Sequence, residues 1–247
     1  MGKRPLIRRR GRGGMQFRAA VTGKLKPAKY PSFGLDDTHE GEIFDLVHET
    51  GRDVPLSKIR FGDGSISFIP AILGTRVGSK ISFGLEAKTK DGNVISIQNI
   101  PDGTTVCNVE KQFGDGGTLI KSAGADATVF SHTDGGVVLK LASGKFTKLN
   151  PKNRAMIGTL AGGGVKDRPL MRAGVAWRRF KSKGQKYPIV RGVAQAAYVH
   201  PHGGGRHQHV GQSSTVSRNA PPGAKVGSIA ARKTGRARLK ERKQSIK

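Results

Sequence analysis

Apolar and polar residues alternate along the central part of the chain, with the two-residue period of a β-strand that buries one face. The run EIFDLVHET at 42–50 shows this alternation, and the tight-turn tripeptide GDG at 62–64 separates two further runs. Pro70 indicates a strand end or a sheet edge, because proline cannot donate to a strand ladder. The runs predict strands at 42–50, 54–61, 65–73, 93–100, 104–110, 118–124, 127–133, 137–143 and 155–160.

Short strands separated by glycine-rich turns predict a mainly β protein built from antiparallel barrels. The tripeptide PDG at 101–103 and the stretch GDGG at 114–117 are such turns, and KTKDG at 88–92 divides the strand-rich part in two. We therefore expect two small β-barrels in tandem. Residues 228–243 contain helix formers without an apolar stripe, so any helix there would depend on a partner.

Charge divides the chain differently from hydropathy. The net charge is +27, yet residues 30–167 carry 15 basic and 16 acidic residues. Residues 1–29 carry ten basic and no acidic residues, and residues 168–247 carry 19 basic and one acidic. These two ends are poor in apolar residues, so we expect them to be largely disordered alone and to order against a polyanion. A solvated tail that only aids solubility is the alternative.

The N-terminus has no apolar core of a signal peptide, and no run approaches 18 apolar residues, so we expect no membrane partner. The single cysteine, Cys107, excludes an internal disulfide framework and suits a reducing compartment. We therefore expect a cytoplasmic protein.

Four of the seven histidines lie within HPHGGGRHQH at 200–209. A zinc site usually draws its ligands from Cys, His and carboxylates that form a closed cage, yet no cysteine is near and no acidic residue lies between Asp167 and Glu241. Catalysis by His200 or His202 would need a positioned partner, and none is visible nearby in sequence. We therefore expect no metal, no cofactor and no catalytic residue. The glycines instead allow close backbone approach to another surface, such as folded RNA.

Other glycine-rich stretches carry no nucleotide-binding motif. The stretches at 114–122 and 161–169 lack P-loop spacing, and no G-x-G-x-x-G opens a helix. We therefore expect neither an enzyme nor a small-molecule substrate. Residues 172–192 interleave Trp177, Phe180 and Tyr187 with seven basic residues, which suits base stacking with phosphate contact. An aromatic cluster that covers a barrel edge is the alternative, and both can hold together.

RNA contacts are expected from the basic ends, the aromatic-basic stretch and the histidine loop. The candidate residues are Arg8, Arg9, Arg10, Arg12, Lys24, Lys26, Arg172, Trp177, Arg178, Arg179, Lys181, Lys183, Arg191, His200, His202, Gly203, Gly204, Gly205, Arg206, Arg218, Lys225, Arg232, Lys233 and Arg236.

Several motifs occur in an order typical of one family. RGVAQAAYVHPHGGG at 191–205 and TVSRNAPPGAKVGSIAARKTGR at 215–236 follow IPDGTTVCNVE at 100–110 and NRAMIGTLAGGGVKDRP at 153–169. In these motifs the chain resembles the universal large-subunit ribosomal protein number two, in its archaeal and eukaryotic branch, and the short tail favours archaea. The resemblance covers nearly the whole chain.

The resemblance implies a basic N-terminal extension at 1–35, an OB-fold RNA-binding domain at 36–88, an SH3-like barrel at 89–167 and a basic C-terminal extension at 168–247. It implies a ribosomal protein that binds large-subunit ribosomal RNA and contacts neighbouring ribosomal proteins. It also implies roles in association with the small subunit and in organising the peptidyl transferase centre, which His200 and His202 would approach.

One departure from the family pattern concerns the residues before the histidine loop. Family members often carry an acidic or amide residue just before the first histidine, whereas residues 195–199 here read QAAYV. No adjacent carboxylate can polarise His200, which favours a structural role. Two other classes remain as alternatives: a general DNA-binding or chromatin-like protein, and a metal-dependent hydrolase built on the histidines.

Overall fold

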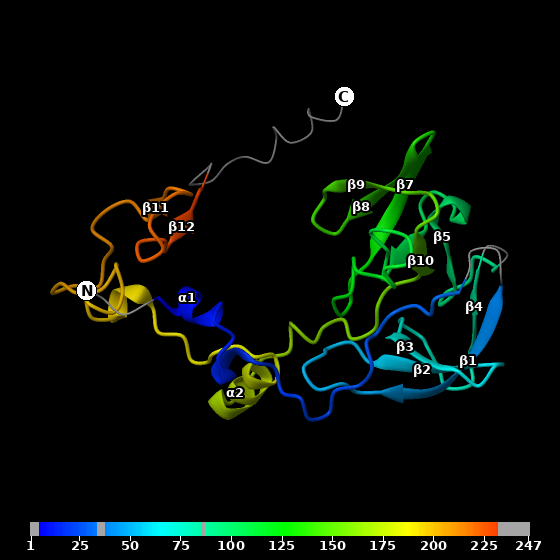
Figure 1. Ribbon diagram of the computed structural model, residues 1–247, viewed down its shortest axis with the longest axis horizontal. Helices are drawn as coiled ribbons and strands as arrows, with labels where there is room; N and C mark the ends of the chain where they lie inside the picture. The colour runs from blue at the N-terminus through cyan, green and yellow to red at the C-terminus, as the bar shows by residue number, and fades with distance from the viewer. Residues whose placement is uncertain (1–4, 34–37, 85–86, 232–247) are drawn as a thin grey trace. The chain divides into compact units, whose positions relative to one another are not determined.

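The computed structural model describes residues 5–33, 38–84 and 87–231, and the chain forms two compact units (Figure 1). The first, here called the β unit, comprises residues 20–183. The second, here called the terminal unit, has described residues from both ends of the chain, 5–19 and 184–231. Along the described residues, no helix is long and apolar enough to cross a membrane.

The β unit contains one mixed, mostly antiparallel sheet, so the mainly β prediction is confirmed. Its spatial order is β3-β2-β1-β4-β5-β10-β6-β7-β8-β9. The strands are β1 (His39–Val47), β2 (Leu56–Phe61), β3 (Ile66–Pro70), β4 (Lys80–Phe83), β5 (Val94–Ser96), β6 (Thr105–Cys107), β7 (Ala127–Thr133), β8 (Gly136–Leu141), β9 (Phe146–Leu149) and β10 (Arg154–Ile157).

The sequence pattern predicts most of these strands and misses two. β7 has the predicted bounds, whereas β4 and β9 are four residues each and too short for a clear alternation. The predicted strand at 118–124 is absent, and that segment contributes only the isolated bridge between Val109 and Leu119. Residues 97–99, predicted as the end of a strand, form a short 3₁₀ turn after β5.

A β-bulge interrupts each of two strand pairs. The register of β1 against β2 shifts between Ile43 and Asp45, and that of β7 against β8 shifts between Val129 and Ser131. A bulge re-aims the side chain at the extra residue. The residues at the two shifts, Phe44 and Phe130, are 51% and 56% exposed.

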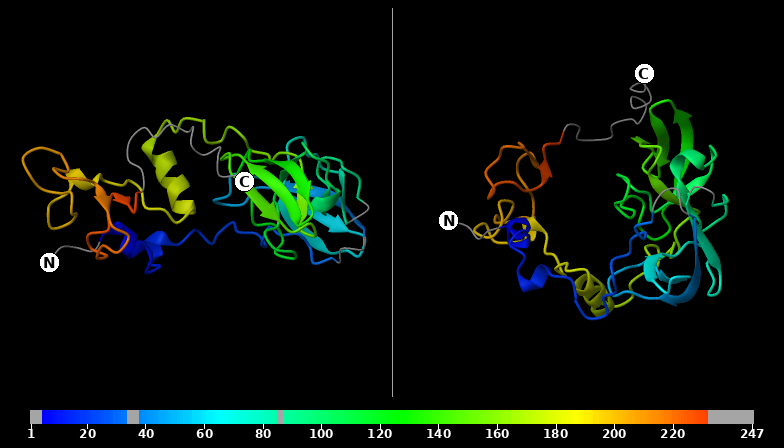
Figure 2. Two further views of the ribbon diagram at one scale, coloured as in Figure 1. Left: turned by 90° about the horizontal axis from the view of Figure 1, so that it is seen from above. Right: turned by 45° about the vertical axis from the view of Figure 1, so that its right-hand side comes forward.

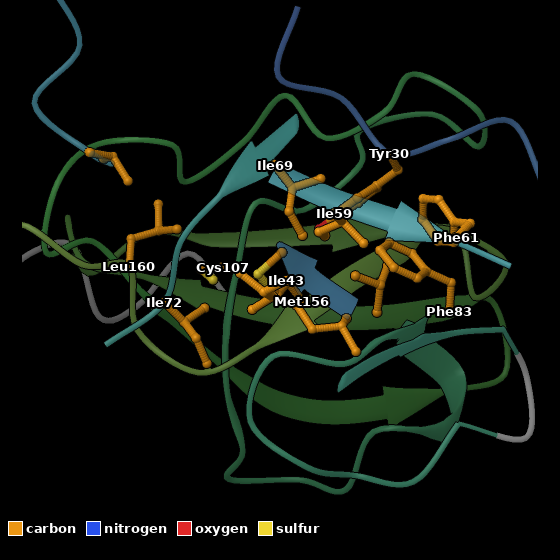
Figure 3. Packing of buried hydrophobic residues seen from close by; sticks show 13 residues of the cluster. Tyr30, Ile43, Ile59, Phe61, Ile69, Ile72, Phe83, Cys107, Met156 and Leu160 are labelled. Carbon is orange, nitrogen blue, oxygen red and sulfur yellow. The ribbon is translucent and has the colours of Figure 1, made fainter. Parts of the chain in front are cut away.

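Three short strands separate two hydrophobic cores. On β10, Met156 packs into the first core, while Ala155 and Ile157 pack into the second, because successive strand residues point to opposite faces. β5 and β6 divide their residues in the same way. Figure 3 shows the first core, in which Cys107 and Met156 lie among residues of β1 to β4. Residues beyond position 88 therefore complete the core of the strands that precede it.

The segment before β1 is part of the same core. Tyr30 is 4% exposed and its hydroxyl donates to the backbone oxygen of Asn108. Burial raises the pKa of this hydroxyl well above its usual range, so it remains a donor. The chain thus enters the β unit before position 36 as a packed strap rather than as a free arm.

A buried ion pair lies where this strap meets the sheet. The Arg154 guanidinium lies 2.8 Å from the Glu110 carboxylate, and the two side chains are 7% and 0% exposed. The same carboxylate accepts backbone N–H bonds from Arg154 and Gly116, both at 3.0 Å. Arg154 also donates to the Pro31 carbonyl oxygen at 2.9 Å. Every charged atom of the pair therefore has a partner, which is what burial of charge requires.

The β unit ends in the helix α2 (Ala173–Ser182), which the sequence interpretation missed. The aromatic and basic composition of residues 172–192 predicts stacking and phosphate contact rather than a helix. Their apolar positions at 173, 176, 177 and 180 follow the i, i+3, i+4, i+7 spacing of a helix face, and Ala176 is its buried residue.

The terminal unit combines the two ends of the chain. It contains α1 (Leu6–Arg10), η1 (Met15–Phe17), η3 (Gly192–Ala194) and the short parallel pair β11 (Thr215–Val216) and β12 (Ser228–Ile229). In both views of Figure 2 the blue α1 lies next to the orange and red C-terminal segment of this unit. Much of its backbone is in turns held by local hydrogen bonds.

Replacement of Glu110 by glutamine is expected to lower the free energy of unfolding by about 3–5 kcal/mol, because the buried Arg154 charge loses its counterion. Denaturant titration of the full chain measures this. The matched control is Asp102→Asn, which breaks the pair of Asp102 with His132 at 2.7 Å, where Asp102 is 56% exposed. The control should cost less than about 1 kcal/mol. Equal losses in both variants would contradict the structural role of Glu110.

Candidate nucleic-acid interface

The predicted RNA-contact residues divide between the two units. Arg232, Lys233 and Arg236 lie outside the described residues. The terminal unit holds Arg8, Arg9, Arg10, Arg12, Arg191, His200, His202, Gly203, Gly204, Gly205, Arg206, Arg218 and Lys225. The β unit holds Lys24, Lys26, Arg172, Trp177, Arg178, Arg179, Lys181 and Lys183.

The described part of the terminal unit is uniformly basic. Residues 5–19 and 184–231 include ten lysines and arginines and no acidic residue. Like charges at this density repel one another, and no carboxylate within these residues can compensate them. A polyanion in contact with the unit would remove the repulsion, so the charge favours the bound state.

Residues from both ends of the chain line one cavity in the terminal unit. Its volume is about 540 Å³, and Arg9 and Arg10 of α1 lie on its wall together with His200 and Lys225. Val199, Val226 and Ile229 contribute apolar lining, and Lys186, which the sequence interpretation did not select, adds a further cation. The structure thus brings the predicted residues Arg9 and Arg10 together with His200 and Lys225, which lie at least 190 positions further along the sequence.

The histidine loop is folded on itself. The backbone N–H of His202 donates to Nδ1 of His200 at 3.0 Å, and the two imidazole rings lie 5.2 Å apart, edge to face. Since Nδ1 of His200 accepts a hydrogen bond, the neutral ring carries its proton on Nε2. Burial, with the nearby His202 as a second cause, lowers the pKa of His200. His200 is therefore a neutral hydrogen-bond donor at pH 7.

The glycines of the loop serve different purposes. A Cβ on Gly203 would overlap the carbonyl oxygens of Gln195 and Ala196, so its close approach is to this chain itself. Gly204 and Gly205 have φ of +88° and +83°, a region that favours glycine. A Cβ on Gly205 would meet only the His207 backbone oxygen, at 3.7 Å, so that side of the loop is open.

The histidines do not assemble into a metal cluster within the described residues. No group of three or more His, Cys, Asp or Glu side chains there could hold a metal ion.

Helix α2 presents one aromatic residue and turns two cations inward. Trp177 is 47% exposed, and the Lys181 ammonium lies 4.6 Å from the centre of its ring. Lys183 donates to Asp53 at 2.6 Å, and Arg179 lies 3.6 Å from the same carboxylate. The hydrogen bond from Lys183 holds the pKa of Asp53 below its usual value. Arg179 and Lys183, both predicted to contact RNA, therefore hold α2 against Asp53 instead.

A second cavity, of about 570 Å³, lies between α2 and the β1–β2 connection within the β unit. Its lining includes three residues predicted from the sequence to contact RNA, Arg172, Arg179 and Lys183. Arg52 and Arg168, which were not predicted, also line it. Lys24, by contrast, lies 3.2 Å from the nearly buried Glu49, so a carboxylate of this chain holds it. Arg52 shares that carboxylate at 2.7 Å.

Comparison with known proteins gives a consistent result. A family model described as "Ribosomal Proteins L2, C-terminal domain" matches residues 90–241. The chain is 76% identical to the large ribosomal subunit protein uL2 of Cenarchaeum symbiosum, over 98% of this chain and 100% of that protein. The uL2 protein of Nitrosopumilus maritimus is 75% identical, with 98% and 100% covered. That of Sulfurisphaera tokodaii is 45% identical, with 96% and 98% covered.

Opening of the histidine loop should be visible in the titration of His200. Gly203→Ala places a methyl group against two carbonyl oxygens, so the loop opens and the pKa of His200 rises toward its usual value of 6.5. The chemical shift of the His200 Cε1 proton, followed against pH by NMR, measures it. The control Gly223→Ala has no atom within 4 Å of the new methyl group. An unchanged His200 titration in Gly203→Ala would show that the loop packing does not set it.

Loss of the Asp53 carboxylate should loosen α2. Because the pKa of folded Asp53 lies below its usual value, its ion pairs stabilise the docked helix above that usual value and are lost as the pH falls through the folded pKa. Asp53→Asn at neutral pH should therefore speed hydrogen exchange of the α2 amides by about two- to fivefold. Asp134→Asn, at the β7–β8 turn, is the control. If α2 exchanges equally in both variants, Asp53 does not anchor it.

Proposed function

The chain belongs to the ribosomal protein L2 family as an archaeal-type member, and from this premise we propose that it is a non-catalytic structural constituent of the large ribosomal subunit that binds ribosomal RNA directly. Its place in the cell is then the ribosome, in the cytoplasm. No observation favours the alternative of a general DNA-binding protein.

The charge of the terminal unit is the observation that supports RNA binding. The described residues of this unit include ten basic and no acidic residues from both ends of the chain, and four of the basic ones, Arg9, Arg10, Lys186 and Lys225, line its cavity. Contacts between such side chains and phosphates release condensed counterions, which is the main source of salt-dependent affinity for nucleic acid. The ends of the chain are therefore proposed to supply most of the affinity.

The histidine loop would act through shape and neutral hydrogen bonds. His200 is uncharged at pH 7, so Nε2 can donate to a phosphate, a base edge or a 2′-hydroxyl without adding a charge. Gly205 leaves one side of the loop open to close approach by RNA. Arg206 next to it is exposed and would pair with a phosphate.

The β unit is proposed as the scaffold of this assembly. Its α2 presents Trp177 for stacking, with the exposed Arg178 and Lys181 beside it. The assignment of an OB-fold to 36–88 and of an SH3-like barrel to 89–167, between two extensions, is part of the proposal. So are contacts with neighbouring ribosomal proteins and the small subunit, and a position of the histidine loop near the peptidyl transferase centre.

The tagged full chain is expected to sediment with the large ribosomal subunit through a sucrose gradient after a high-salt wash. A chain that washes off and remains at the top of the gradient would contradict the proposal, because its basic residues would then be only weakly held polycations.

Salt dependence tests which residues bind phosphate. Replacement of Arg8, Arg9 and Arg10 by alanine should make the slope of log affinity for large-subunit ribosomal RNA against log salt shallower by about 2 to 3, since each phosphate contact contributes about 0.7–0.9. Filter binding at several salt concentrations measures it. The matched control replaces three exposed lysines of the β unit, Lys140, Lys145 and Lys148, and should leave the slope nearly unchanged.

A further inference from the structure

The ten-stranded sheet of the β unit ends at β9. In the spatial order of the strands β9 has β8 on one side, and among the described residues no strand pairs with its other side. The outward N–H and C=O groups of Phe146–Leu149 are therefore available to a further strand. β7, β8 and β9 form this end of the sheet in Figure 1.

An aromatic pair lies on the outer face beside this edge. Phe130, at the bulge of β7, and Phe146, the first residue of β9, pack edge to face with ring centres 4.9 Å apart. They are 56% and 38% exposed. Val129 and Leu149 on the same strands point into the second core, so the two rings are not needed to fill it. Exposed apolar rings beside an open edge are typical of a binding surface.

From Gly135 to Asn153 the chain carries charge of a single sign, while Asp134, at the β7–β8 turn that Lys148 approaches, is acidic. Residues 135–153 carry four lysines, Lys140, Lys145, Lys148 and Lys152, and no acidic residue, although residues 30–167 as a whole are almost neutral. All four lysines are exposed, and within the described part of the chain none forms an ion pair with a carboxylate. An acidic partner would neutralise them.

Lysines also protect sheet edges from non-specific pairing, and that role must be weighed. The opposite edge of the sheet, β3, has such protection from Pro70, which cannot donate to an added strand. β9 has no proline and begins with an exposed phenylalanine, so only its lysines oppose pairing. Lysines repel basic strands but attract acidic ones. The β9 edge therefore selects for an acidic partner strand and does not exclude strand pairing altogether.

The geometry also favours protein over RNA at this place. Unstacked bases bind on flat, exposed ring faces, whereas Phe130 and Phe146 are turned edge to face against each other. Backbone groups along a strand edge match the repeat of another strand, and nucleic acid cannot use them as a ladder.

We propose that the edge of β9, with Phe130 and Phe146, binds an extended acidic segment of another protein by strand addition. The partner's backbone would extend the sheet, its apolar side chains would cover the two rings, and its carboxylates would pair with Lys145 and Lys148. The surface is separate from the phosphate-binding residues proposed above.

Site-specific photo-crosslinking can test this because Cys107 is the chain's only cysteine and is fully buried. Burial raises the pKa of its thiol to about 12, so it does not compete for a thiol reagent. The full-length variant Ser143→Cys, in the turn before β9, is labelled with benzophenone maleimide and incorporated into large ribosomal subunits in place of the natural chain. The matched control is Ser65→Cys, an exposed serine in the turn before the opposite edge strand β3.

The expected result is a crosslink from position 143 to one protein segment with more acidic than basic residues, which the control label does not reach. Lys145→Glu with Lys148→Glu in the same labelled chain should lower the yield at least about fivefold, whereas Lys145→Arg with Lys148→Arg should retain it. A crosslink to RNA, to a segment without excess acidic residues, or none above the unirradiated sample would overturn the proposal. Incorporation, followed by sedimentation, is scored separately and tests the function proposed above.

Discussion

The rest of the β unit depends on one buried carboxylate. Glu110 neutralises Arg154 and accepts N–H bonds from two segments of backbone, while Arg154 reaches the carbonyl oxygen of Pro31. Three parts of the chain more than 40 positions apart therefore meet at a single charge pair. An uncompensated charge at this depth would be strongly destabilising. The strand β10, the loop that follows β6 and the strap before β1 must therefore form together.

The two units differ in how far their own carboxylates compensate their basic residues. Some acidic residues of the β unit fix structure, as Asp53 does for α2 and Glu49 for Lys24. The described part of the terminal unit has no acidic residue to use in this way, so turns, glycine contacts and a few hydrogen bonds hold it. The β unit thus compensates part of its positive charge internally, and the described part of the terminal unit leaves its charge for an external partner.

The sequence alone predicts the mainly β class and most strands, because the alternation of apolar residues is local. It misses β4 and β9, which are too short to show a period, and α2, whose helical spacing was obscured by its basic residues. The pairing of Arg179 and Lys183 with Asp53 could not be predicted, since 126 or more positions separate the partners. For the same reason the sequence could not indicate that Arg9 and Lys225 line one cavity.

The strands buried on both faces bear on how such a chain can change over evolutionary time. Met156 and its neighbours on β10 serve two interiors at once, so a substitution there must satisfy both. Neither half of the sheet can be exchanged, duplicated or transferred to another protein as a module, because each half alone would lack residues that complete its hydrophobic core. Innovation is then easiest at the ends of the chain and at the sheet edges, where no second interior constrains the residue.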